Sequence, residues 1–228
     1  MTKRAKIEFH VSESDILAPV TKFGGQPVWI EGPQWPVSKG LGIPMRFICQ
    51  IALDEKIFPG CAGKIAYLFM TDGEEYVDGT WEPDGGENAV IIQPSGNPSV
   101  PVENVSGGPT LQEYVAVPGH EKLQPRNVIF AVELALDEDP ELISQDEESG
   151  LSDDQWQEYA DRLSGNKIGG TPGFLQGDEF PDDKQSWKLL LQLDSTAVPF
   201  SVNFGDSGIA YAFINEDASI GKFLWQCC

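Results

Sequence analysis

Short apolar runs, each bounded by charged or turn-forming residues, dominate the hydrophobic pattern of the chain. Residues 47–53 and 189–193 form two such runs, whose length favours buried strands over helices. In residues 65–69 a period of two places isoleucine, tyrosine and phenylalanine on one face, which predicts a strand with that face in the core. Residues 128–136 alternate in the same way, and there a helix is the alternative to a strand.

One segment carries the signals of a helix. Ser152 is a good N-cap residue, and Gln155 three residues later completes a capping box. Apolar residues follow at helical spacing from Trp156 to Leu163, and Gly165 is placed to end the helix. We expect this helix to dock by one apolar stripe beside the segment that follows it.

The chain contains an internal duplication. Residues 21–32 recur as residues 166–177, and five of these 12 positions are identical. The further matched blocks keep their order: residues 35–36 with 180–181, 45–51 with 187–193, 65–70 with 209–214, and 90–93 with 223–226. Each copy begins with a Gly-Gly pair and a proline, which is typical of a turn. We therefore expect a single domain over residues 1–228, with repeats at about 21–93 and 166–228 and an acidic, Pro/Gly-rich insert at about 94–165.

The net charge of −21 is concentrated in two stretches. No Lys or Arg occurs in residues 65–121, which hold 10 acids, or in residues 127–161, which hold 12. Such a field argues against nucleic acid and anionic membrane as partners, because phosphates bind through clustered cations. A basic protein is the partner that this charge favours.

The expected compartment and the expected lack of a cofactor rest on features that the sequence does not contain. No apolar run approaches the roughly 20 residues of a membrane-spanning helix, and no apolar signal core follows the basic N-terminal residues. The four cysteines lack the spacing of a zinc pair, so we expect free thiols, no metal and no cofactor. These observations predict a soluble, cytoplasmic protein.

Two glutamines occupy equivalent positions in otherwise apolar strands of the two copies. Buried amides need hydrogen-bond partners, so Gln50 and Gln192 either tie together the backbone of their own halves or line a pocket between the halves. In the second case Asp194 and Asp206 would join them as binding residues. No catalytic residue is identified.

A short segment around Ser207 resembles the nucleophile region of chymotrypsin-like serine proteases. That chemistry requires a histidine and an aspartate beside the serine, and neither His10 nor His120 lies in a matching segment. The duplication places residues 205–208 just before a repeated strand, so we expect a tight turn instead.

The combination of motifs resembles the YwqG-like family of bacterial proteins of unknown function. The residues that carry the resemblance, beside the two Gly-Gly-x-Pro segments, are Trp35-Pro36, Gln50, Pro59, Tyr67-Leu68-Phe69, Gln192, Gly205-Asp206-Ser207-Gly208 and Trp225-Gln226. The resemblance implies an irregular α+β fold, no established activity, and relatives that serve as immunity proteins in bacterial toxin systems. We therefore expect an α+β fold of internally duplicated, β-rich halves with few helices.

Two functional hypotheses follow. The first is a protein-interaction module whose acidic surface binds a basic protein, with an immunity-like role as one form of it. The second is an enzyme or small-molecule binder with a carboxylate and amide pocket between the two halves. The oligomeric state is not predicted.

Overall fold

The computed structural model describes residues 1–73, 77–120 and 122–228. Its strands are β1 (Thr2–Val11), β2 (Lys22–Gly24), β3 (Trp35–Pro36), β4 (Arg46–Ala52), β5 (Ile65–Met70), β6 (Asn88–Gln93), β7 (Val102–Glu103), β8 (Gln112–Val115), β9 (Gln124–Asn127), β10 (Ile129–Asp139), β11 (Lys167–Gly169), β12 (Trp187–Asp194), β13 (Ile209–Asn215) and β14 (Gly221–Gln226). Its helices are α1 (Gln145–Ser149) and α2 (Asp153–Leu163).

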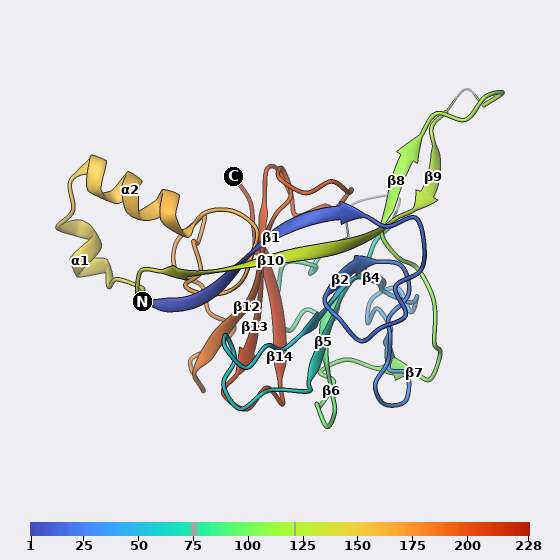
Figure 1. Cartoon of the computed structure of the whole chain (residues 1–228), viewed down its shortest axis with the longest axis horizontal. Coiled ribbons are helices and arrows are strands. Elements are labelled where there is room, and N and C mark those ends of the chain that lie inside the picture. Colours follow the sequence, from blue (N-terminus) through green and yellow to red (C-terminus); the bar gives the residue numbers. More distant parts are fainter. Residues whose placement is uncertain (74–76, 121) are drawn as a thin grey trace.

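A single antiparallel sheet of ten strands organises the molecule (Figure 1). Its order is β14-β13-β12-β11-β1-β10-β2-β4-β5-β6, so the long strands β1 and β10 lie at its centre. The sheet curls until its edge strands β14 and β6 contact each other. At this contact Gly221 leaves room for Val90, because a Cβ atom at Gly221 would lie 2.4 Å from the Val90 Cγ1 atom.

The two halves of the sheet repeat one pattern on either side of β1 and β10. Lys22 pairs with Gln50 in the first half, and Lys167 pairs with Gln192 in the second. β4 and β12 also share an irregularity in register, after Phe47 and Leu189 respectively. Strand β1 completes the second half by pairing with β11, and β10 completes the first by pairing with β2.

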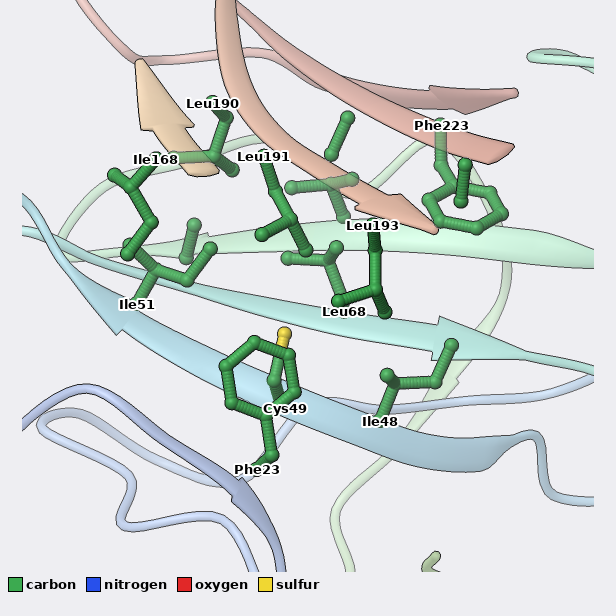
Figure 2. Close-up of a cluster of buried hydrophobic side chains, with 14 of the residues drawn as sticks. Phe23, Ile48, Cys49, Ile51, Leu68, Ile168, Leu190, Leu191, Leu193 and Phe223 are labelled. Carbon is green, nitrogen blue, oxygen red and sulfur yellow. The ribbon is translucent and has the colours of Figure 1, made fainter. Parts of the chain in front are cut away.

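The predicted strands in residues 47–53, 65–69 and 189–193 are confirmed as β4, β5 and β12, and the alternation in residues 128–136 belongs to strand β10. Their alternating side chains form three apolar clusters. The largest lies between the halves, where Ile51, Leu68 and Cys49 face Ile168, Leu191 and Leu193 (Figure 2). Burial raises the pKa of the Cys49 thiol well above its usual value, so this cysteine is packed as a neutral apolar residue.

The outer face of each half-sheet is covered by the loop that follows its Gly-Gly pair. Trp29 lies over Tyr67, with ring centroids 4.6 Å apart, and Phe174 lies over Tyr211 at 5.1 Å. The face of residues 65–69 that was predicted to be buried is therefore buried, but beneath a loop rather than against the other half. Both faces of each half-sheet are filled by side chains.

The expectation of an α+β fold is wrong, because the structure is mostly β and has two helices in its described part. The capping box of Ser152 and Gln155 forms as predicted. However, α1 and α2 extend to one side of the sheet and form no layer on it (Figure 1). Leu163 is the only buried residue of α2, and Trp156 is 43% exposed, so the predicted docking by a whole apolar stripe is wrong.

Local sequence signals predicted the helix correctly, but such signals do not show whether a helix packs against the sheet. The apolar side of α2 instead contacts the chain just before it. The Trp156 indole donates to Glu148 at 2.7 Å, and the Tyr159 hydroxyl donates to the Glu141 carbonyl at 3.1 Å. No helix in the described part of the chain is long and apolar enough to cross a membrane.

Candidate functional site: buried polar clamps and an acidic cleft

In the first half, buried polar side chains hold the Gly-Gly loop against the outer face of the sheet. The Gln50 amide accepts from the Val28 N–H at 2.8 Å and donates to the Val20 carbonyl at 2.8 Å. The Tyr67 hydroxyl donates to the Val28 carbonyl at 2.8 Å. The Lys22 ammonium donates to the Gln26 carbonyl of the same loop at 2.7 Å, and to the Ile16 carbonyl of the segment before β2 at 2.8 Å. Burial lowers the pKa of Lys22 and raises that of Tyr67 to about 12.

The second half repeats this arrangement. The Gln192 amide accepts from the Gly173 N–H at 2.8 Å and donates to the Leu163 carbonyl at 2.9 Å. The Tyr211 hydroxyl donates to the Gly173 carbonyl at 2.7 Å. The Lys167 ammonium donates to the Leu163 carbonyl at 2.7 Å, so this carbonyl at the end of α2 is held by two side chains.

Four residue pairs make up these clamps: Lys22 and Lys167, Gln50 and Gln192, Tyr67 and Tyr211, and Gln93 and Gln226. Sequence reasoning singled out only the second pair. The other three are also identical in the aligned copies, and this identity was the signal that could have found them. In both copies the amides are bonded within their own half.

The two aspartates named with the glutamines lie elsewhere. A carboxylate oxygen of Asp194 caps the turn after β12 by accepting from the Thr196 N–H at 2.8 Å. Asp206 is exposed in a tight turn, where Gly205 has a φ of 76° and Ser207 a φ of 50°. The structure therefore does not gather Gln50, Gln192, Asp194 and Asp206, and none of them lines either cleft described below. The turn expected at residues 205–208 is confirmed.

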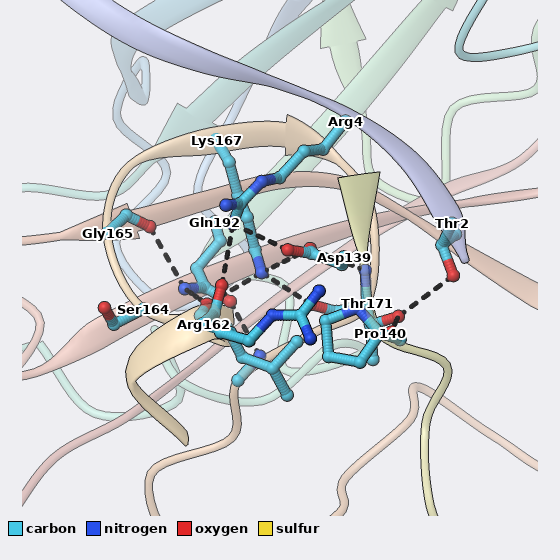
Figure 3. Close-up of polar contacts among 12 residues, drawn as sticks. Thr2, Arg4, Asp139, Pro140, Arg162, Ser164, Gly165, Lys167, Thr171 and Gln192 are labelled. Carbon is cyan, nitrogen blue, oxygen red and sulfur yellow. Dashed lines mark hydrogen bonds and ion pairs between the residues drawn. The ribbon is translucent and has the colours of Figure 1, made fainter. Parts of the chain in front are cut away.

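A buried charge cluster joins β1, β10 and β11 (Figure 3). Asp139 is fully buried, with one carboxylate oxygen 2.6 Å from the Arg4 guanidinium and the other 2.8 Å from the Lys167 ammonium. The second oxygen also accepts from the Thr171 N–H at 3.0 Å. Burial lowers the pKa of Lys167 to about 8, although the bond to Asp139 opposes this change.

The same cluster fixes the end of α2 relative to β1. Arg4 donates to the Arg162 carbonyl at 2.9 Å, and its other terminal nitrogen lies 3.0 Å from a carboxylate oxygen of Asp137. A hydrogen bond from Lys6 is the main reason that the pKa of Asp137 lies well below its usual range. The helix is thereby held beside the centre of the sheet at its C-terminal end.

Between α2 and the β1–β10 pair lies an open cleft of about 770 Å³, which we call the acidic cleft. Five carboxylates and three cations line it. The lining residues are Arg4, Lys6, Asp137, Glu138, Asp154, Gln157, Glu158, Asp161, Arg162 and Ser164.

The two walls of the acidic cleft differ in how their charges are paired. On the sheet wall, Asp137 is paired with Arg4 and Lys6. On the helix wall, Asp154, Glu158 and Asp161 lie on one face of α2, because they are spaced four and three residues apart. Within the described residues none of these three forms an ion pair. The Asp161 carboxylate accepts a hydrogen bond from the Gln157 amide at 2.7 Å, so the helix wall is a row of carboxylates that have no cation partner in the described part of the chain.

The other acidic stretch, residues 65–121, is only partly described, since Glu74, Glu75 and Glu121 lie outside the described residues. Within it, Glu87 is buried and accepts from the Ser38 and Thr71 hydroxyls at 2.6 and 2.7 Å. This carboxylate therefore belongs to the interior rather than to a surface.

Among the residues that the structure describes, one group of side chains has ligand atoms close enough to hold a metal ion. Atoms of Glu8, His10 and Glu133 lie within 4.8 Å of one another on the solvent side of β1 and β10. The three side chains are 50% to 76% exposed, so they lack the buried supporting contacts that orient the ligands of established metal sites.

Comparison with known proteins places the chain in a family without assigning it an activity. The model of the family described as "Domain of unknown function (DUF1963)" matches residues 21–222. No curated protein matches the chain. The expectation of an uncharacterised family is confirmed, and the narrower YwqG-like resemblance stays a prediction. With most of its length matched, from the first Gly-Gly loop to strand β14, the chain belongs to the DUF1963 family.

Proposed function

We propose that this protein is an interaction module that binds a basic protein in the acidic cleft. The observation that carries the proposal is the row of carboxylates on α2, Asp154, Glu158 and Asp161, which pair with no cation among the described residues. Carboxylates that have no cation of their own are available to Lys and Arg side chains of a partner. The excess of acids in the lining adds a field that attracts a basic surface.

The position of α2 suits this role. Its C-terminal end is held by hydrogen bonds to the Arg162 and Leu163 carbonyls, so the row of carboxylates has a fixed orientation relative to β1. The rest of the helix extends away from the sheet, where a partner reaches it without displacing the core (Figure 1). Preorganised charges increase the rate of association and select the partner.

The test is affinity capture from a lysate of the organism that makes the protein, with a charge-neutralised variant as the comparison. The cleft variant is Asp154→Asn/Glu158→Gln/Asp161→Asn. We expect the wild-type protein to capture a specific basic protein at about 0.15 M salt, and to capture less of it at about 0.5 M, where exposed charges are strongly screened. The cleft variant should lose this protein.

A matched control carries the same change in net charge at scattered, exposed acids: Glu103→Gln/Asp183→Asn/Glu216→Gln. We expect the control to capture the partner as the wild-type protein does. Equal loss in both variants would show general attraction between an acidic protein and cations, and the proposal would then be wrong. Equal capture by all three proteins would place the binding surface outside the acidic cleft.

A further inference from the structure

A second groove lies where the N-terminus, the loop after β4 and the second Gly-Gly loop meet. It has a volume of about 420 Å³, within the range of small-ligand pockets. Ile57 packs directly over Gly169, whose φ of 71° and missing Cβ allow this approach; a Cβ atom there would lie 2.3 Å from the Ile57 Cγ2 atom. The first half and the second half thus build this groove together, and we call it the lysine groove.

The charge of the lysine groove is opposite to that of the protein. Lys3, Lys56, Lys188 and the α-amino group of Met1 line it, whereas Glu141 is the only lining acid. The α-amino group pairs with Glu141, and Lys3 pairs with Glu138 outside the groove. In the described part of the chain, no ion pair engages the ammonium groups of Lys56 and Lys188. Two cations are therefore left for an anion.

The remaining lining is largely apolar. Phe180, Trp187 and Leu142 contribute to it, and all three are accessible to solvent in part. Leu142 is 39% exposed, an exposure that a bound apolar group would reduce. An apolar floor with a few polar groups at its rim is the usual composition of a small-molecule site.

We propose that the lysine groove binds a small organic carboxylate with an aromatic or branched apolar body. The carboxylate lies against Lys56 and Lys188, and the apolar body lies against Phe180 and Trp187. The overall negative charge of the protein does not prevent this, because charges beyond about 8 Å are largely screened at physiological ionic strength whereas the two lysines are in contact with the ligand. This inference is independent of the function proposed for the acidic cleft.

The experiment titrates the full-length protein with phenylacetate and indole-3-acetate, and with the neutral amide of each, by calorimetry and by NMR chemical shifts. We expect saturable binding of an acid with a dissociation constant of about 1 mM or below, and binding at least about tenfold weaker for its amide. Lys56→Gln/Lys188→Gln should weaken binding of the acid at least about tenfold. The control variant Lys39→Gln/Lys122→Gln, which changes two exposed lysines outside the groove, should bind as the wild-type protein does.

Three results would overturn the proposal. The first is no saturation by either acid up to about 10 mM. The second is equal affinity for acid and amide, which would show that the lysines do not recognise the charge; this comparison needs no variant and so does not depend on folding of a mutant. The third is binding of a peptide that ends in phenylalanine without binding of the free acids, which would make the occupant a protein C-terminus.

Discussion

Replacing Asp139 by asparagine tests whether the buried charge cluster stabilises the fold. The substitution keeps the size of the side chain and one acceptor for the Thr171 N–H, but it removes the negative charge between Arg4 and Lys167. Arg4 is 5% exposed and Lys167 is 1% exposed, so neither cation gains water in compensation. Breaking a buried pair by removing one partner typically costs about 3–5 kcal/mol, and we expect a loss in that range in the free energy of unfolding.

Urea unfolding followed by circular dichroism measures the effect. For a urea m value of about 3 kcal/mol per molar, the midpoint should fall by about 1–1.7 M. The double variant Asp139→Asn/Lys167→Met removes the uncompensated cation as well, but it also removes the bonds from Lys167 to the Leu163 and Thr171 carbonyls, so it should recover about 1 kcal/mol relative to Asp139→Asn alone. A loss below about 1 kcal/mol for Asp139→Asn, or no recovery in the double variant, would refute the reasoning.

Four further predictions follow from the clamps and loops. Because burial lowers the pKa of Lys167 to about 8 from 10.5, the unfolded chain binds more protons between these values, so the free energy of unfolding should rise over that range and the rise should vanish in Lys167→Met. Because burial raises the pKa of Tyr67 to about 12 from 10.0, the unfolded chain loses its proton first, and stability should fall again above about pH 10 in urea titrations. Gln192→Ala should cost about 2–4 kcal/mol in urea unfolding, since it leaves buried backbone groups unpaired, and a cost under about 1 kcal/mol would contradict the clamp. Gly24→Ala should destabilise the protein far more than Gly63→Ala in thermal melts. Both glycines have a positive φ, 68° and 81°, but only at Gly24 would a Cβ atom lie 2.1 Å from a backbone oxygen. Equal losses of stability in the two variants would show that this close approach is unimportant.

Local patterns in the sequence predicted the elements that depend on local physics. The strand at residues 65–69 was recognisable because its alternation reports two different faces. The capping box of α2 was recognisable because its hydrogen bonds join residues three apart. The fold class was predicted wrongly because it depends on where a helix packs, and the apolar side of α2 meets its own preceding segment rather than the sheet.

The candidate sites were predictable only in part. The charge census located an acidic stretch at residues 127–161, but it could not show that one face of α2 would line a cleft with β1. Arg4, Asp139 and Lys167 come from three strands that are neighbours in the sheet but far apart in the sequence, and no local pattern predicts that they meet. The partners of Gln50 are backbone groups in the segments before and after β2, and backbone groups carry no signal in the side chains of the sequence.

The pairing of β1 with β11 has a consequence for the chain as it leaves the ribosome. Strand β1 is made before all the other strands of the sheet, but its neighbour β11 is made only after six of the ten strands, and the first half acquires β10 only after its own four strands are complete. In each half, one strand pairing therefore forms only after a strand far away in the sequence has been synthesised, and such non-local pairings form slowly. A nascent chain that ends before β11 would leave one edge of β1 unpaired, and exposed edges pair readily with other chains. The two halves are repeated in sequence, but they can complete their fold only as one unit.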